Sequence, residues 1–114
     1  MTRSELADFM DAIFEKKIMR LRSDGQKEYA QSEDNAFANF DRLASDIGLD
    51  RKKVLWVFAM KHRDGIASHL NGHTSQREDV TGRIADLIVY LFILWAMIDD
   101  ERGSKPLPEC QSSR

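Results

Sequence analysis

Asp86 is the residue whose type and surroundings most favour chemistry in this sequence. It is followed directly by the apolar run 87–98, and a carboxylate in that context is costly to bury unless it has a partner. Asp79 and Arg83 precede it at helical spacing, so two interpretations are open. The three side chains form a solvated ladder of ion pairs, worth about 0.3 kcal/mol per pair, or Asp86 binds a metal ion or a polar ligand.

Glu78 is a second candidate metal ligand, and it also has a structural explanation. It follows Ser75 by three residues. This is the spacing of a capping box, in which the hydroxyl and the carboxylate each accept a hydrogen bond from a free backbone N–H. A capping carboxylate keeps lone pairs for a metal ion, so the two roles are compatible.

Lys61 and Asp64 form a third candidate pair, because they lie about one helical turn apart. They pair with each other, or Lys61 holds a phosphate and Asp64 a metal ion. His62 stands on the apolar line of its helix, which favours a partly buried, hydrogen-bonded histidine over a ligand. The histidines and the single Cys110 lack the spacing of a zinc site.

The first third of the chain holds cations and amides that suit a nucleotide. Asn35 and Asn39 could present their amides to a base or a ribose, and Asn35 could instead cap a helix. The basic residues form either a solvated face or a set of phosphate contacts. Acidic residues alternate with them, which disfavours binding to a nucleic-acid backbone. These basic residues are Lys16, Lys17, Arg20, Arg22 and Lys27.

Several catalytic motifs are absent from the sequence. It has no glycine-rich phosphate loop, no G-x-S-x-G elbow and no paired Cys and His nucleophile. A nucleophilic enzyme is therefore disfavoured. Hydrolysis would have to rely on metal-assisted attack by water, which needs clustered carboxylates.

Helices must position these residues, since apolar side chains recur at steps of three and four along most of the chain. Capping residues and glycines set the expected bounds. We predict helices from Thr2 to about Arg22, from about 35 to 47, from 51 to 70 and from about 76 to 101. Together they predict an all-α fold, an antiparallel bundle of three long helices and one short helix.

The predicted fourth helix has two apolar stripes. The second stripe and Trp56 of the third helix form a further packing surface, which favours a homo-oligomer. The apolar residues of that second stripe are Tyr90, Ile93 and Met97. We assign the other stripe to the core, and it comprises Val80, Ile84, Leu87, Leu91, Leu94, Trp95 and Ile98.

Length and composition agree with one such domain. The chain has 114 residues, 42% of them hydrophobic, and a formal net charge of −2, so it carries no basic field for nucleic acid. We predict one domain over 1–101 and a flexible tail over 102–114. The run 87–98 is shorter than the ~20 residues of a membrane span. Because a signal peptide is also lacking and a single cysteine fits a reducing compartment, we expect a cytoplasmic protein without membrane contact.

Several short segments within residues 15–100 resemble a known family. They are Glu28-Tyr29-Ala30, Asn35-x-Phe37-x-Asn39-Phe40, Lys61-His62-x-Asp64-x-Ile66 and Glu78-x4-Arg83-Ile-x-Asp86-Leu-x2-Tyr90. Their order resembles the nucleotide-modification-associated domain 1 family of small phage and bacterial proteins. That family is itself similar to the MazG-like all-α nucleoside triphosphate pyrophosphatases.

The resemblance implies a MazG-like bundle, usually oligomeric, that handles nucleotides with Mg²⁺. It implies that Glu78 and Asp86 hold the metal. It also implies that Lys61 and Arg83 meet phosphates. The pocket residue implied in addition is Asn39 or Tyr29.

The chain departs from the MazG-like pattern in its acidic residues. It has no Glu-x-x-Glu pair, and its only Glu-x-x-Asp is Glu5-x-x-Asp8 at the start of the first predicted helix. The departure favours nucleotide binding over hydrolysis. We expect a nucleotide-handling protein, either a Mg²⁺-dependent hydrolase of a nucleoside triphosphate or a non-catalytic binding module. The alternative is a homo-oligomeric helical interaction protein.

Overall fold

The computed structural model describes residues 1–21, 23, 35–73 and 79–103. In this part of the chain all regular structure is helical, which confirms the predicted all-α fold. The elements are α1 (Arg3–Ile13), η1 (Phe14–Ile18), α3 (Ala38–Ile47), α4 (Arg51–Leu70) and α5 (Val80–Glu101). Residues 104–114 of the predicted tail lie outside the described residues.

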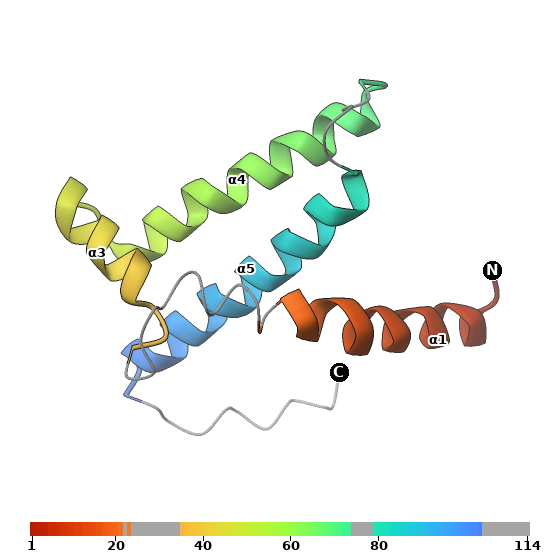
Figure 1. Ribbon diagram of the computed structural model, residues 1–114, viewed down its shortest axis with the longest axis horizontal. Helices are drawn as coiled ribbons and strands as arrows, with labels where there is room; N and C mark the ends of the chain where they lie inside the picture. The colour runs from red at the N-terminus through yellow and green to blue at the C-terminus, as the bar shows by residue number, and fades with distance from the viewer. Residues whose placement is uncertain (22, 24–34, 74–78, 104–114) are drawn as a thin grey trace.

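The helices α4 and α5 form an antiparallel pair that carries the other helices (Figure 1). The start of α4 contacts the end of α5 through Arg51 and Glu101. Near the start of α5, Arg83 contacts the carbonyl of Lys61 in α4. The short α3 packs on α4, and η1 packs on α5, whereas α1 projects away from the pair. This arrangement does not confirm a MazG-like bundle.

Local capping interactions explain where three of the helices begin or end. Before α1, the Thr2 hydroxyl accepts from the Glu5 backbone N–H at 3.0 Å, and the Glu5 carboxylate accepts from the Thr2 N–H at 2.9 Å. The Asp50 carboxylate caps α4 by accepting from the Lys52 N–H at 2.7 Å. Gly48 ends α3 with a φ of 72°, a conformation that glycine adopts without strain. These caps confirm the sequence predictions.

Two helix bounds differ from the prediction. The last helix begins at Val80 instead of about 76, because the Asp79 side chain accepts from the Thr81 N–H and acts as the N-cap. The predicted capping box of Ser75 and Glu78 lies outside the described residues. The first helix contains the π-helical turn Phe14–Ile18, which inserts a residue into the helical repeat and changes the face presented beyond it.

The core lies where α3, α4 and α5 meet. Phe40 of α3 is fully buried, and its ring lies 5.8 Å from that of Phe58 and 6.5 Å from that of Tyr90. A smaller cluster joins η1 to α5, where Ile18 packs with Ala85 and Val89. The buried residues of the larger cluster are Phe40, Val54, Leu55, Ala59, Tyr90 and Met97.

The face of α5 that packs against α3 and α4 is largely the second stripe. Tyr90 and Met97 are buried, whereas Leu91 and Trp95 are 46% and 58% exposed. The predicted core assignment of Ile84, Leu91 and Trp95 is therefore wrong. Because α5 is apolar on nearly all sides, its periodicity does not select the face that packs. The predicted oligomer surface is correspondingly wrong for Tyr90 and Met97, which are internal to the chain.

By length and composition, α5 could cross a membrane. Its 22 residues include an 18-residue window of mean hydropathy 1.7, of which 22% is buried inside the protein. This window extends beyond the uninterrupted apolar run 87–98 on which the prediction rested. Core helices of soluble proteins meet the same criterion, so the predicted lack of membrane contact stays a prediction.

We expect acid to weaken the contact between the start of α4 and the end of α5. Hydrogen bonds from the Lys52 backbone and side chain lower the pKa of Asp50. The hydrogen bond from Lys52 likewise lowers the pKa of Glu101. Carboxylates with a lowered folded-state pKa stabilise the fold above their ordinary pKa of about 4. This stabilisation is lost as the pH falls through the folded-state values.

The variant Asp50→Asn tests this pH dependence, since asparagine keeps the capping oxygen and removes the charge. Urea denaturation followed by circular dichroism at pH 7, 5, 4 and 3 should show a shallower loss of stability for the variant than for the wild type. Equal losses in the two proteins would contradict the assignment.

Candidate functional site

Facing turns of α4 and α5 bring together a group of polar residues that we call the α4–α5 cluster: Lys61, His62, Gly65, Arg83 and Asp86. The Arg83 side chain lies directly across Gly65. A Cβ atom added to Gly65 would stand 2.4 Å from Arg83 Cδ and 2.7 Å from Cζ. The guanidinium reaches Lys61, whose carbonyl oxygen accepts from Nη1 at 3.5 Å. Two of the predicted phosphate contacts, Lys61 and Arg83, are therefore neighbours.

His62 and Asp86 face each other within the same cluster. His62 Nδ1 lies 3.9 Å from Asp86 Oδ2, with the two side chains 14% and 42% exposed. At that distance the pair has no hydrogen bond, and Nδ1 is buried without a hydrogen-bond partner in the described part of the chain. The ring packs at 5.4 Å on that of Tyr90. His62 is thus partly buried as predicted, but the predicted hydrogen bond is wrong at Nδ1.

Two of the predicted site residues have partners elsewhere. Asp64 is 67% exposed at its side chain and pairs at 3.0 Å with the adjacent Arg63, so the predicted pair with Lys61 is wrong. The Asn39 side-chain oxygen accepts from Arg42 on its own helix, α3, at 2.7 Å. Neither side chain is shown in contact with the α4–α5 cluster. The candidates Tyr29 and Glu78 lie outside the described residues.

The amide of Asn35 has a structural role at the start of α3. Its oxygen accepts from the Phe37 N–H at 2.9 Å, and its nitrogen donates to Asp41 Oδ2 at 3.0 Å. The helix itself begins at Ala38. This turn agrees with the capping alternative, and it engages the amide that could otherwise meet a base or a ribose.

The described residues do not fit a Mg²⁺ site. No three His, Cys, Asp or Glu side chains among them lie close enough to share one metal ion. Of the predicted pair Glu78 and Asp86, the structure describes Asp86, whose carboxylate faces an imidazole. Mg²⁺ is held by oxygen ligands in near-octahedral geometry. We therefore derive no chemical step through a metal ion.

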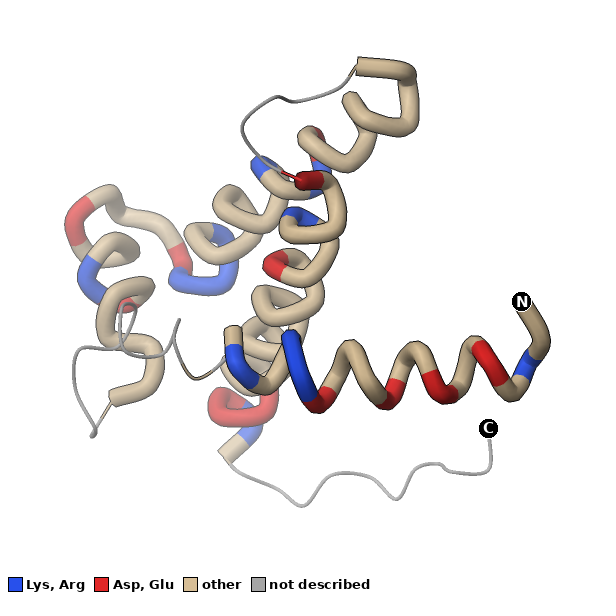
Figure 2. Tube along the Cα trace, turned by 45° about the vertical axis from the view of Figure 1, so that its right-hand side comes forward, with Lys and Arg blue, Asp and Glu red and all other residues tan. Residues whose placement is uncertain are grey.

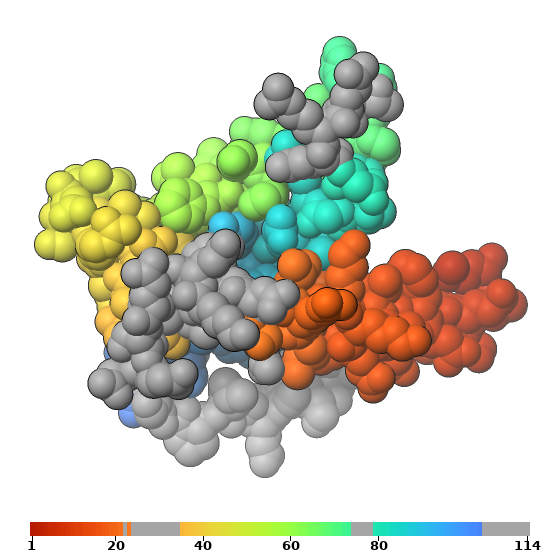
Figure 3. Space-filling model, in the orientation of Figure 1, coloured from red at the N-terminus to blue at the C-terminus, as the bar shows by residue number. Residues whose placement is uncertain are grey.

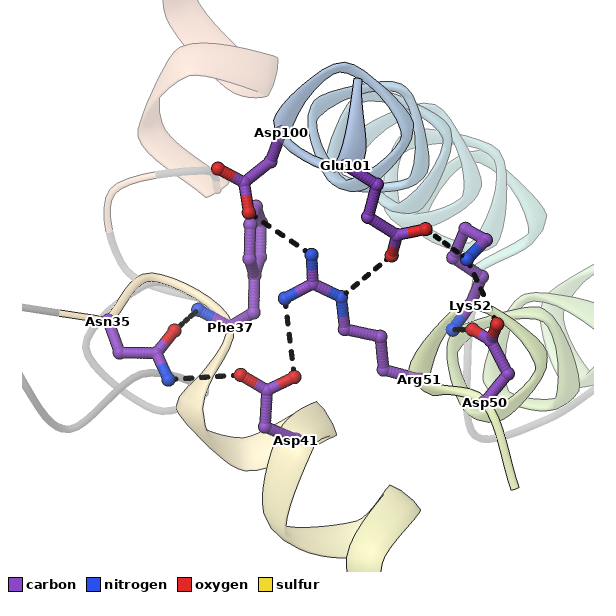
Figure 4. Close-up of polar contacts among 8 residues, drawn as sticks. All are labelled: Asn35, Phe37, Asp41, Asp50, Arg51, Lys52, Asp100 and Glu101. Carbon is purple, nitrogen blue, oxygen red and sulfur yellow. Dashed lines mark hydrogen bonds and ion pairs between the residues drawn. The ribbon is translucent and has the colours of Figure 1, made fainter. Parts of the chain in front are cut away.

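A charged cluster at the junction of α3, α4 and α5 was not predicted. Figure 4 shows the Arg51 guanidinium between three carboxylates, at 3.3 Å from Asp41, 3.2 Å from Asp100 and 3.1 Å from Glu101. Its Cζ lies 4.8 Å from the ring centroid of Phe37. Burial lowers the pKa of Arg51, but the hydrogen bonds to these carboxylates outweigh burial and raise it.

The sequence contains a signal for this junction, the acidic end of α5. Residues 99–101 are all acidic, and acidic side chains are unfavourable at a helix C-terminus, where the helix dipole is negative. Such a run indicates that cations from another element lie close by. Arg51 and Lys52 supply them. Because both are consumed in ion pairs that join helices, we assign the junction a structural role.

Comparisons with known proteins do not place the chain in a family. No family model, no curated protein and no solved structure matches it. The resemblance to the nucleotide-modification-associated domain 1 family therefore stays a prediction. The same holds for its implied nucleotide, Mg²⁺, oligomeric state and cytoplasmic location.

Proposed function

We propose that this protein binds a nucleotide through the α4–α5 cluster, with Lys61 and Arg83 contacting the phosphates. The observation that supports the proposal most is the convergence of these two cations from different helices. The Lys61 ammonium is exposed and makes no ion pair with any described residue. An ammonium beside a guanidinium suits a phosphate, because both donate charge-assisted hydrogen bonds and the guanidinium does so in a fixed fork.

Gly65 supports the same proposal through its place inside a helix. A glycine in a helix interior costs about 1 kcal/mol relative to alanine, so a packing reason is expected for it. Here the reason is the Arg83 side chain, which crosses α4 at the space that a Cβ would fill. Gly65 therefore acts as a positioning residue that lets the guanidinium lie beside Lys61.

The proposal stops at binding and does not include hydrolysis. The α4–α5 cluster contains a single carboxylate, Asp86, whereas metal-assisted attack by water needs several. Asp86 is 42% exposed at its side chain and could accept a hydrogen bond from a ribose hydroxyl. The proposed product of the encounter is a bound, unchanged nucleotide.

Isothermal titration with nucleoside mono-, di- and triphosphates tests the proposal, with and without a chelator. We expect saturable binding that the chelator leaves unchanged, with no product in chromatography of the incubated nucleotide. Failure of every nucleotide to bind would overturn the proposal. A strict Mg²⁺ requirement with turnover would replace it with the hydrolase hypothesis.

The variant Gly65→Ala should separate binding from stability. The added methyl group must displace Arg83, so affinity should fall by roughly the 10-fold or more that the loss of a charge-assisted hydrogen bond gives. The thermal midpoint should stay equal or rise, because alanine favours the helix. The two changes in opposite directions distinguish a positioning residue from a residue needed for folding.

The matched control is Gly82→Ala, which changes glycine to alanine in the neighbouring helix. Nothing lies within 4 Å of a Cβ at Gly82, so its affinity for nucleotide should equal that of the wild type. Arg83→Ala should reproduce the loss seen in Gly65→Ala. If Gly65→Ala binds as tightly as the control does, the proposed role of Gly65 is wrong.

A further inference from the structure

The α1 helix lacks an apolar partner among the elements described here. None of its residues is buried, and Leu6, Phe9 and Met10 are 48%, 52% and 61% exposed. Figure 3 shows α1 projecting from the rest of the molecule. A helix of 11 residues is marginal in water when it lacks tertiary packing, since most helical stability comes from a buried apolar face. This helix therefore needs a surface that the described part of its own chain does not supply.

The exposed stripe of α1 continues a stripe that is already packed. Further along the same helical segment, Ile18 packs against Ala85 and Val89 of α5. The ring of Phe14 meets that of Phe92 edge-on, with centroids 6.0 Å apart. The side chains of α1 thus extend the seam with α5 past the edge of that helix, into solvent (Figure 1).

The outer face of α5 next to this seam is apolar and accessible. Leu91, Phe92 and Trp95 are 46%, 47% and 58% exposed. Between η1 and α5 lies an open cavity of about 180 Å³. It could receive an apolar side chain from outside, and its lining residues are Phe14, Ile18, Met19, Val89, Phe92 and Ile93.

The charges along the same helical segment identify the occupant. Apart from Arg3, the charged residues up to residue 15 are acidic, and those from 16 to 20 are basic, as Figure 2 shows. Two such segments in antiparallel orientation place the acidic part of each beside the basic part of the other. In parallel orientation like charges would meet. The acidic residues are Glu5, Asp8, Asp11 and Glu15, and the basic residues are Lys16, Lys17 and Arg20.

We propose that the protein forms a two-fold symmetric dimer in which the α1 helices of two copies lie antiparallel. In this arrangement the N-terminal half of α1 lies beside the partner's η1 and on the outer face of the partner's α5. Leu6, Phe9 and Met10 are then buried in each direction by the same contact, as an isologous interface requires. The surface is separate from the α4–α5 cluster, so the dimer does not depend on the proposed nucleotide site.

Analytical ultracentrifugation at micromolar concentration tests the dimer. The wild type should sediment with twice the mass of the chain, and Phe9→Asp with the mass of one chain. The control is Ile47→Asp, an apolar-to-acid change at a site that is 59% exposed on α3, which should remain dimeric. A monomeric wild type, or a dimeric Phe9→Asp, would overturn the proposal.

Exchange of charges tests the antiparallel orientation. Asp8→Lys and Lys17→Glu should each weaken the dimer, because each brings like charges together. The double variant should restore the affinity of self-association, since opposite charges again face each other. Circular dichroism verifies that every variant keeps its helices. If the double variant associates no better than the weaker single variant, the antiparallel orientation is wrong.

Discussion

Phe40→Ala is expected to lower the free energy of unfolding by about 3–5 kcal/mol, the usual cost of removing a buried phenylalanine ring. The ring is fully buried and packs between Phe58 of α4 and Tyr90 of α5. Its loss removes the aromatic contacts that hold α3 onto the α4–α5 pair and leaves a cavity. Domains of this size have a total stability of only about 5–15 kcal/mol, so this is the largest effect that we predict for one side chain.

Urea denaturation followed by circular dichroism measures this effect. The matched control is Ile47→Ala on the same helix, because Ile47 is 59% exposed and its truncation should change stability by less than about 0.5 kcal/mol. Phe40→Leu keeps part of the packing and should lie between the two, which secures a measurement if the alanine variant does not fold. Equal stability of Phe40→Ala and Ile47→Ala would show that α3 does not depend on this ring.

Arg51→Ala should destabilise the protein by about 2 kcal/mol, more than a surface ion pair contributes. The Arg51 side chain is only 18% exposed, while its three carboxylate partners are 37–57% exposed, which limits the effect through solvent screening. Removal of the guanidinium leaves Asp41, Asp100 and Glu101 facing one another. It also removes the cation–π contact with Phe37 and the cation at the negative end of α5.

Arg42→Ala is the matched control for Arg51→Ala. Arg42 pairs with Asp46 four residues later on α3, with both side chains more than 60% exposed, and such a pair contributes about 0.3–0.5 kcal/mol. Thermal denaturation should therefore show a drop for Arg51→Ala that is several times larger. Added salt should reduce the difference only in part, because the Arg51 contacts are partly shielded from solvent. Similar midpoints for the two variants would mean that the junction does not join the helices.

Much of the candidate site could be predicted from residue types, but its internal geometry could not. The sequence indicated Lys61, Arg83 and Asp86, because a charged residue beside an apolar run is conspicuous on a helix. It could not show that Gly65 makes room for Arg83, or that Asp86 faces His62. Those contacts depend on the register of α4 against α5, across 22 residues of sequence in the case of Arg83 and Lys61. The partner of Asp64 was also wrong, since its neighbour Arg63 competes for the same carboxylate.

The sequence by itself determined that the described chain is helical and where α1, α3 and α4 begin or end. Capping and periodicity act between residues two to four positions apart, as the contacts of Thr2 with Glu5 and of Asp50 with Lys52 illustrate. Such local interactions can be recognised without knowing what lies across the core.

Only the tertiary structure decided which face of α5 is buried, what surrounds Arg51, and that α1 has an apolar stripe without a partner. Arg51 and Glu101 are 50 residues apart, and their contact exists because α4 and α5 run antiparallel over their whole length. On α5 both stripes are apolar, so the free energy of burial alone does not distinguish them. The choice falls to Tyr90 and Met97 because α3 and α4 pack on that side.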